Sequence, residues 1–73
     1  MTTQPTNFPL RGDHITLEAL LKASGLAGGA SAKALIAEGS VQVNGEVDAR
    51  RGRKLRAGDE VALGEQRVRV QAA

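Results

Sequence analysis

Residues 32–45 decide the fold, and they read Ala32-Lys33-Ala34-Leu35-Ile36-Ala37-Glu38-Gly39-Ser40-Val41-Gln42-Val43-Asn44-Gly45. In the first half, apolar side chains recur with the period of a helix, which Gly39 ends. In the second half, two valines alternate with a glutamine as in a strand, and Asn44-Gly45 is typical of a tight hairpin turn. A short helix that leads through a glycine into a strand and a hairpin indicates an α+β domain.

A second helix is predicted upstream, beginning after Thr16 and ending before Gly25. Thr16 is a favoured N-cap residue, and Glu18 lies in the first turn, where the helix dipole favours an anion. Gly25 suits the left-handed position that follows many helices. One face of this helix is apolar because three leucines recur at helical spacing, namely Leu17, Leu20 and Leu21.

The strands that follow are short and separated by turns. A strict two-residue turn at Asn44-Gly45 would place Val43 opposite Glu46 and leave Val47 on the other face. The turn at Asn44-Gly45 is therefore predicted, whereas its strand register stays open, since a longer or bulged loop would bring the valines together. Further along the chain, apolar residues alternate with other residues around 61–63 and 68–70, which predicts two strands. Arg67 and Arg69 alternate with the valines of the second strand and are predicted to face solvent.

The ends of the chain carry weaker signals. Residues 1–12 contain two prolines and no periodicity, so we expect a flexible N-terminal arm, held at most by Phe8 or Leu10. The last residues, 71–73, are expected to fray. These boundaries predict one folded domain over residues 13–71.

A dense cluster of positive charge follows the hairpin and forms the basic run, defined as residues 50–56, Arg50-Arg51-Gly52-Arg53-Lys54-Leu55-Arg56. The chain has 10 Lys+Arg and 8 Asp+Glu, a net charge of +2, so the residues outside this run sum to −3. A local basic patch on a mildly acidic body favours docking to a polyanion. Leu55 is the one apolar residue of the run and is predicted to anchor it to the core.

Composition excludes several functions. The chain has no cysteine and a single histidine, His14, so neither a metal cluster nor a nucleophile motif is present and no cofactor is expected. Phe8 is the only aromatic residue, which nearly excludes base stacking on aromatic platforms. Neither a membrane span nor an export signal is recognisable, so we expect a cytoplasmic protein.

The glycines at positions 28 and 29 precede a lysine, as in some phosphate-binding loops. A Walker loop places Gly directly before its lysine, whereas Lys33 is flanked by alanines. What remains is a weaker prediction, in which backbone N–H groups at Gly28 and Gly29, free of bulky side chains, let a phosphate come close.

The order of these segments resembles the S4 RNA-binding domain over roughly residues 15–63. The matching motifs are Ala32-Lys33-x-Leu35-Ile36-x-x-Gly39-x-Val41-x-Val43-Asn44-Gly45 and Gly58-Asp59-Glu60-Val61. The basic run and the small size are similar to stand-alone bacterial S4-like proteins. The resemblance implies an S4-like (αL) fold, with two short helices on a small, bent, mainly antiparallel sheet. It also implies binding of structured RNA, often ribosomal or transfer RNA, without catalysis.

The resemblance also assigns residues. Lys33 matches a basic residue of the second helix that faces RNA, and Arg51, Arg53 and Lys54 match the basic stretch of the stand-alone proteins. The chain departs from larger S4 domains in having Gly28-Gly29 in place of Ser-Arg. It also has Thr16-Leu17-Glu18 in place of Arg-Leu-Asp. Two usual cationic contacts are missing, which makes the basic run the main expected contributor.

The leading hypothesis is a monomeric, ribosome-associated protein without enzymatic activity that contacts the phosphates of structured RNA and needs neither a membrane nor a small-molecule substrate. The candidate RNA-binding residues are Lys33, Arg50, Arg51, Arg53, Lys54, Arg56, Gly28 and Gly29. One alternative is a protein–protein adaptor. Another is a β-grasp-like small carrier, although such carriers end in Gly-Gly and begin with a hairpin, whereas this chain ends in Gln71-Ala72-Ala73.

Overall fold

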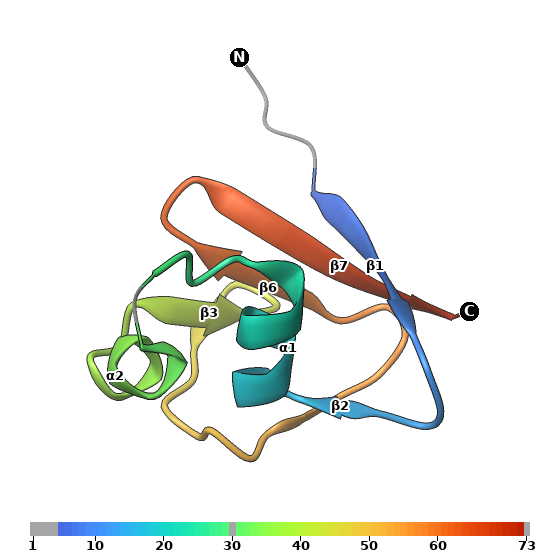
Figure 1. Ribbon diagram of the computed structural model, residues 1–73, viewed down its shortest axis with the longest axis horizontal. Coiled ribbons are helices and arrows are strands. Elements are labelled where there is room, and N and C mark those ends of the chain that lie inside the picture. Colours follow the sequence, from blue (N-terminus) through green and yellow to red (C-terminus); the bar gives the residue numbers. More distant parts are fainter. Residues whose placement is uncertain (1–4, 30, 73) are drawn as a thin grey trace.

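Two helices lie on one face of a five-stranded sheet in the computed structural model, which describes residues 5–29 and 31–72 (Figure 1). The helices are α1 (Leu17–Ser24) and α2 (Ala32–Ala37). The strands of this sheet are β1 (Thr6–Leu10), β3 (Val41–Val43), β4 (Glu46–Val47), β6 (Glu60–Leu63) and β7 (Gln66–Ala72). A separate pair of two-residue strands joins β2 (Ile15–Thr16) to β5 (Lys54–Leu55).

The five-stranded sheet has the order β1-β7-β6-β3-β4. Its neighbours are antiparallel except for β1 and β7, which run parallel. The predicted α+β class, with two short helices on a mainly antiparallel sheet, is therefore confirmed.

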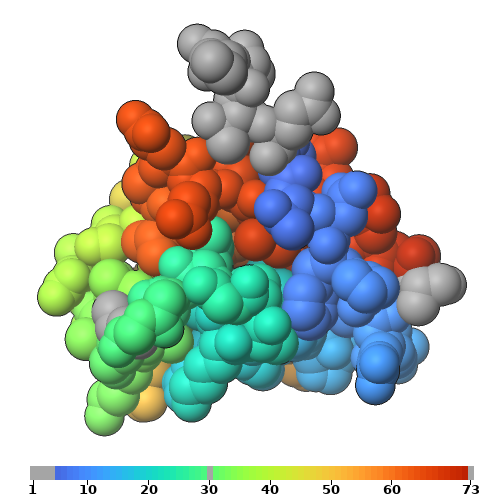
Figure 2. Space-filling model, turned by 45° about the horizontal axis from the view of Figure 1, so that its top comes forward, coloured from blue at the N-terminus to red at the C-terminus, as the bar shows by residue number. Residues whose placement is uncertain are grey.

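The N-terminal segment differs from the predicted flexible arm, because residues 6–10 form the edge strand β1. Thr6 pairs with Val68 and Leu10 with Ala72, and the Leu10 side chain enters the core. Figure 2 shows β1 in blue between the teal surface of α1 and the red C-terminal strand. The pairing partner lies at the far end of the sequence, so no local pattern could indicate this strand. The expected fraying is likewise corrected for residues 71 and 72, which pair with β1, whereas residues 1–4 and 73 lie outside the described residues.

Both helices begin and end as their capping residues predict. The Thr16 hydroxyl oxygen accepts a hydrogen bond from the Ala19 N–H at 3.3 Å, and Ser31 does the same for Ala34 at 3.3 Å. Gly25 adopts φ 74° after α1, in the left-handed region, and its N–H donates to the Lys22 carbonyl. A side chain at this φ would be strained, so the glycine fixes where α1 ends.

The hairpin between β3 and β4 has the predicted turn at Asn44-Gly45, in its strict two-residue form, and this decides the register that the sequence left open. Val43 pairs with Glu46, and Val47 lies opposite Gln42 with 58% of its surface exposed. Asn44 and Gly45 have φ 53° and 87°, as in the type of turn that matches strand twist. The Asn44 side chain also donates to Asp59 and accepts from the Glu60 N–H, and these bonds hold the turn. Turn geometry thus outweighs the burial of one valine.

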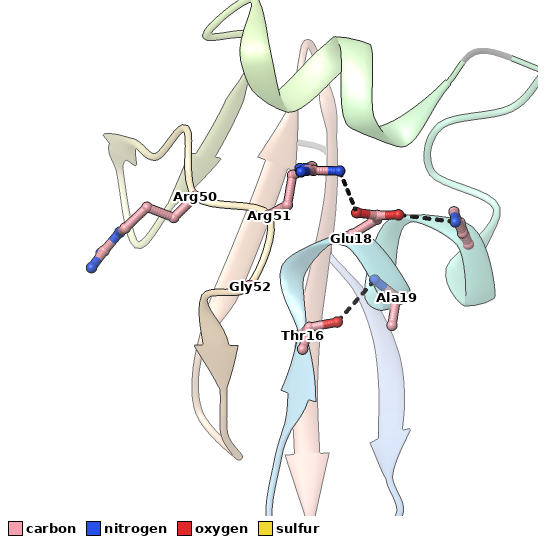
Figure 3. A pocket seen from close by; sticks show the side chains of 7 residues that line it. Thr16, Glu18, Ala19, Arg50, Arg51 and Gly52 are labelled. Atoms are coloured by element: carbon pink, nitrogen blue, oxygen red, sulfur yellow. Dashed lines mark hydrogen bonds and ion pairs between the residues drawn. The ribbon is translucent and has the colours of Figure 1, made fainter.

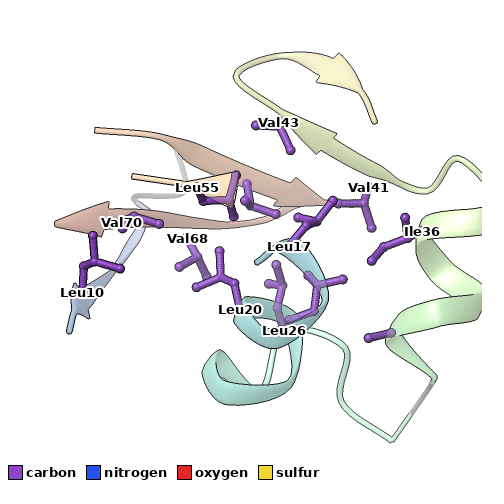
Figure 4. Packing of buried hydrophobic residues seen from close by; sticks show 13 residues of the cluster. Leu10, Leu17, Leu20, Leu26, Ile36, Val41, Val43, Leu55, Val68 and Val70 are labelled. Atoms are coloured by element: carbon purple, nitrogen blue, oxygen red, sulfur yellow. The ribbon is translucent and has the colours of Figure 1, made fainter. Parts of the chain in front are cut away.

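The core lies between the helices and the sheet and is almost wholly aliphatic (Figure 4). Both helices and four strands of the five-stranded sheet contribute buried side chains. They are joined by Leu55 of β5, which is fully buried. The prediction that Leu55 anchors the basic run to the core is confirmed.

Candidate nucleic-acid interface

The backbone of the basic run is fixed to the N-terminal end of α1. The Leu17 N–H donates to the Arg53 carbonyl at 2.9 Å, and the Glu18 N–H donates to the Arg51 carbonyl at 3.2 Å. Thr16 satisfies the next N–H, that of Ala19. These three amides would otherwise lack partners at a helix start. The helix terminus therefore holds the basic run in place and is not itself an open anion site.

A buried carboxylate, that of Asp48, holds two arginines of the basic run. Asp48 Oδ1 accepts from the Arg50 backbone N–H at 2.9 Å and from Arg50 Nε at 3.1 Å. Asp48 Oδ2 accepts from Arg50 Nη2 at 2.9 Å and from Arg53 Nη1 at 2.8 Å. The hydrogen bonds from Arg50 hold the pKa of Asp48 well below its usual range, against the opposing effect of burial, with the Arg53 bond adding to the same shift.

A second carboxylate, that of Glu18 on α1, faces the same run. Glu18 Oε1 accepts from Lys22 Nζ at 3.0 Å, and Glu18 Oε2 lies 3.8 Å from Arg51 Nη1. Figure 3 shows Arg51 pointing toward Glu18, whereas Arg50 points away from the helix. The hydrogen bond from Lys22 lowers the pKa of Glu18, and the charges of Arg51 and Lys33 lower it further. The effect of Lys33, a residue of α2, is the smallest of these contributions.

Two hollows meet at the turn of the basic run. One lies against α1 and is lined by Thr16, Glu18, Ala19, Lys22, Arg50, Arg51 and Gly52 (Figure 3). The other is lined by Arg50, Gly52, Arg53 and Lys54. Because Arg50 and Gly52 belong to both, the turn forms a ridge with positive side chains on either side.

The predicted site residues fall into three groups. Arg50, Arg51, Arg53 and Lys54 line the hollows, whereas Lys33 on α2 lines neither of them. Arg56 is exposed beyond β5 and lines neither hollow.

Gly28 and Gly29 follow the C-terminal end of α1, so the structure does not bring them to the basic run, which contacts its N-terminal end. The Gly28 N–H already donates to the Gly25 carbonyl at 3.0 Å. A phosphate at these glycines would be a separate contact.

The cations differ in how far they are neutralised. Arg50 and Arg53 share Asp48, and Arg51 is near Glu18. Within residues 5–29 and 31–72, Lys33, Lys54 and Arg56 form no ion pair. Among the predicted site residues, they are therefore the cations most available to a ligand.

Sequence reasoning missed the two carboxylates as parts of the site. Asp48 precedes Arg50 by two residues, a spacing that allows a side chain to accept from a backbone N–H, and this was the one available signal. Glu18 was recognised only for its place in the first turn of the helix. Its contact with Arg51 joins distant parts of the chain and leaves no trace in local spacing.

The other paired arginines lie on the far face of the sheet. Val68 and Val70 of β7 point into the core, so Arg67 and Arg69 project from the opposite face, where both pair with Glu60. Both cations lie away from the basic run and provide a control for charge, although Arg67 also lines a hollow with Ser24 and Gly25 at the C-terminal end of α1.

No group of three or more residues suited to metal binding occurs among the described residues. Neither described helix has the length and apolar character that crossing a bilayer demands.

The helix pair, the mainly antiparallel sheet and the anchored basic run define a small α+β module. A family model described as the S4 domain matches residues 8–71, and the chain belongs to the S4 domain family. RNA binding, without catalysis as a rule, is the general property of that family. A comparison with curated proteins finds no match.

Proposed function

We propose that this protein binds structured RNA, ribosomal or transfer RNA in particular, and that it does so without catalysis. The contacts are made to phosphates by the basic run together with Lys33. The observation that carries this proposal is the anchoring of the run. Leu55 is fully buried and two carbonyls of the run accept from α1, so the cations are presented from a fixed backbone.

A fixed cationic surface suits a rigid polyanion better than a flexible one. Lysine and arginine side chains that need little reorganisation lose less entropy on binding. Phosphate contacts fix register without reading sequence, and Phe8 is the chain's only aromatic residue, so stacked bases contribute little. We therefore expect the protein to distinguish RNA shapes more strongly than RNA sequences. We also propose that it acts as a monomer in the cytoplasm.

The number of phosphates contacted sets the dependence on salt. About three to five cations can reach one RNA at once, which predicts a log–log salt slope of roughly −2 to −4. The partial neutralisation of Arg50, Arg51 and Arg53 favours the lower end of that range.

The test is a titration of fluorescent ribosomal and transfer RNA fragments at several salt concentrations. The informative variant is Lys54→Gln/Arg56→Gln. Neither side chain pairs with a described acid, so the substitutions leave the buried carboxylate of Asp48 with both of its arginine partners. The matched control is Arg67→Gln/Arg69→Gln, which removes the same charge from the far face of the sheet. We expect the first variant to lose affinity and about 1.5 units of slope, and the control to change little.

Two results would contradict the proposal. Absence of binding by the folded parent at low salt, across ribosomal and transfer RNA, would show that the family membership describes only the fold here. Equal affinity for structured RNA, duplex DNA and heparin would reduce the interaction to charge alone. A partner that co-purifies after RNase treatment would instead support the adaptor alternative.

A further inference from the structure

Asp48 is the one buried charged residue among residues 5–29 and 31–72. Its side chain is 6% exposed and lies directly beneath the surface assigned to RNA. An acid at this position lowers the positive potential that attracts phosphates. If this surface binds RNA, the loss of attraction caused by Asp48 has to be offset by some other effect of the same residue on binding.

The geometry of the hydrogen bonds supplies that effect. Arg50 directs Nε and Nη2 to the two oxygens of Asp48, which fixes the plane of its guanidinium group. Arg53 Nη1 donates to the same carboxylate. The Arg50 side chain remains 72% exposed and Arg53 31%, so their remaining N–H groups are open to a ligand.

We propose that Asp48 is the positioning residue of the RNA surface. It orients the guanidinium groups of Arg50 and Arg53 before RNA arrives, so that their unused N–H donors meet phosphate oxygens without reordering. This inference rests on the proposed function and adds a specific role within it.

Glu18 provides the contrast. It approaches Arg51 only to 3.8 Å, beyond hydrogen-bonding distance, and its close partner is Lys22 on its own helix. Glu18 therefore orients no arginine of the run, and its charge only repels phosphates. Two carboxylates beside one basic run should have opposite effects on RNA binding.

The proposal makes a prediction opposite to that of simple electrostatics. Asp48→Asn and Glu18→Gln each make the surface more positive by one charge, which by attraction alone strengthens RNA binding in both cases. Asparagine replaces Oδ2 by a donor, so it cannot hold both arginines. We expect Asp48→Asn to weaken RNA binding about five- to tenfold, because two long side chains must then be ordered on binding. Glu18→Gln should leave binding equal or tighter.

A second pair of variants separates positioning from folding. Arg50→Lys/Arg53→Lys keeps every charge and leaves Asp48 with cationic partners, but removes the planar fork. It should lose affinity by a similar factor to Asp48→Asn. Adding Asp48→Asn to this variant should then cause no further loss, a non-additivity that mere destabilisation would not produce. Circular dichroism and urea unfolding establish the folded fraction of each variant.

The outcomes are distinguishable. If the folded parent binds RNA and Asp48→Asn binds as tightly or more tightly, Asp48 has no positioning role. If Asp48→Asn does not fold, unchanged affinity of Arg50→Lys/Arg53→Lys overturns the inference and reduced affinity supports it. If the folded parent binds no RNA, the proposed function fails, and the positioning role fails with it.

Discussion

Replacing Leu55 with alanine tests whether the basic run is anchored in the core. The leucine is fully buried in β5, where its backbone pairs with Ile15 of β2. Leucine-to-alanine changes at buried sites cost about 2–5 kcal/mol, from lost burial and the cavity left behind. A chain of 73 residues has a free energy of unfolding of about 4–11 kcal/mol in all. The substitution therefore removes a large share of the stability.

The assay is urea unfolding followed by circular dichroism. With a slope of about 1 kcal/mol per molar urea, expected for a small domain, the midpoint falls by about 2 M or more. Val47→Ala is the matched control, because this side chain is 58% exposed and its truncation should change stability by less than about 0.5 kcal/mol.

Function supplies the second readout. Leu55→Ala alters no charge, yet a loosened run should bind RNA more weakly under conditions where the variant is still folded. A loss of stability below about 1 kcal/mol would show that Leu55 is not an anchor. Unchanged RNA affinity would show that the fixed backbone of the run does not matter for binding.

Three further predictions concern the turn, the buried acid and the helix cap. Asn44→Ala should cost about 1–3 kcal/mol in urea unfolding, because φ 53° is strained for alanine and the bonds to Asp59 and Glu60 are lost. Asn44→Gly, which relieves the strain, should cost less, and equal losses would assign the whole effect to the bonds. The folded-state pKa of Asp48 lies below its unfolded value of about 3.9, so the carboxylate stabilises the fold above that pH and the stabilisation is lost as pH falls from about 5. Between pH 7 and pH 3, the free energy of unfolding should therefore fall more in the parent than in Asp48→Asn. Parallel curves for the two proteins would contradict this. Thr16→Ala removes the cap of α1 and should cost about 1 kcal/mol by thermal or urea unfolding; no loss would mean that the cap is dispensable.

Local signals in the sequence predicted the parts of the fold that depend on neighbours in the chain. The cap at Thr16, the glycine after α1 and the apolar faces of both helices follow from residues within a turn or two. Leu55 could be assigned to the core because it is the only apolar side chain among five cations. These features need no knowledge of distant segments.

The features that sequence missed depend on distant contacts or on competition between preferences. Strand β1 forms because it pairs with the main chain of β7, and no sequence pattern near residues 6–10 indicates that pairing. The hairpin register stayed open in the sequence because burial of Val47 and the backbone preference of Asn44-Gly45 favour different pairings, and in the structure the turn preference prevails. The distribution of charge at the site was missed for the first reason, because Glu18 meets Arg51 only in the folded chain.

The parallel pairing of β1 with β7 has a consequence for synthesis. The ribosome makes β1 before β7, and because Thr6 pairs with Val68, β1 has to wait for β7 before it can pair. Contacts between such distant segments close slowly, because a long loop must be ordered before they form. Until then β1 and the apolar Leu10 stay uncovered on the nascent chain. We expect the five-stranded sheet to close only after β7 has been made and is free to pair with β1.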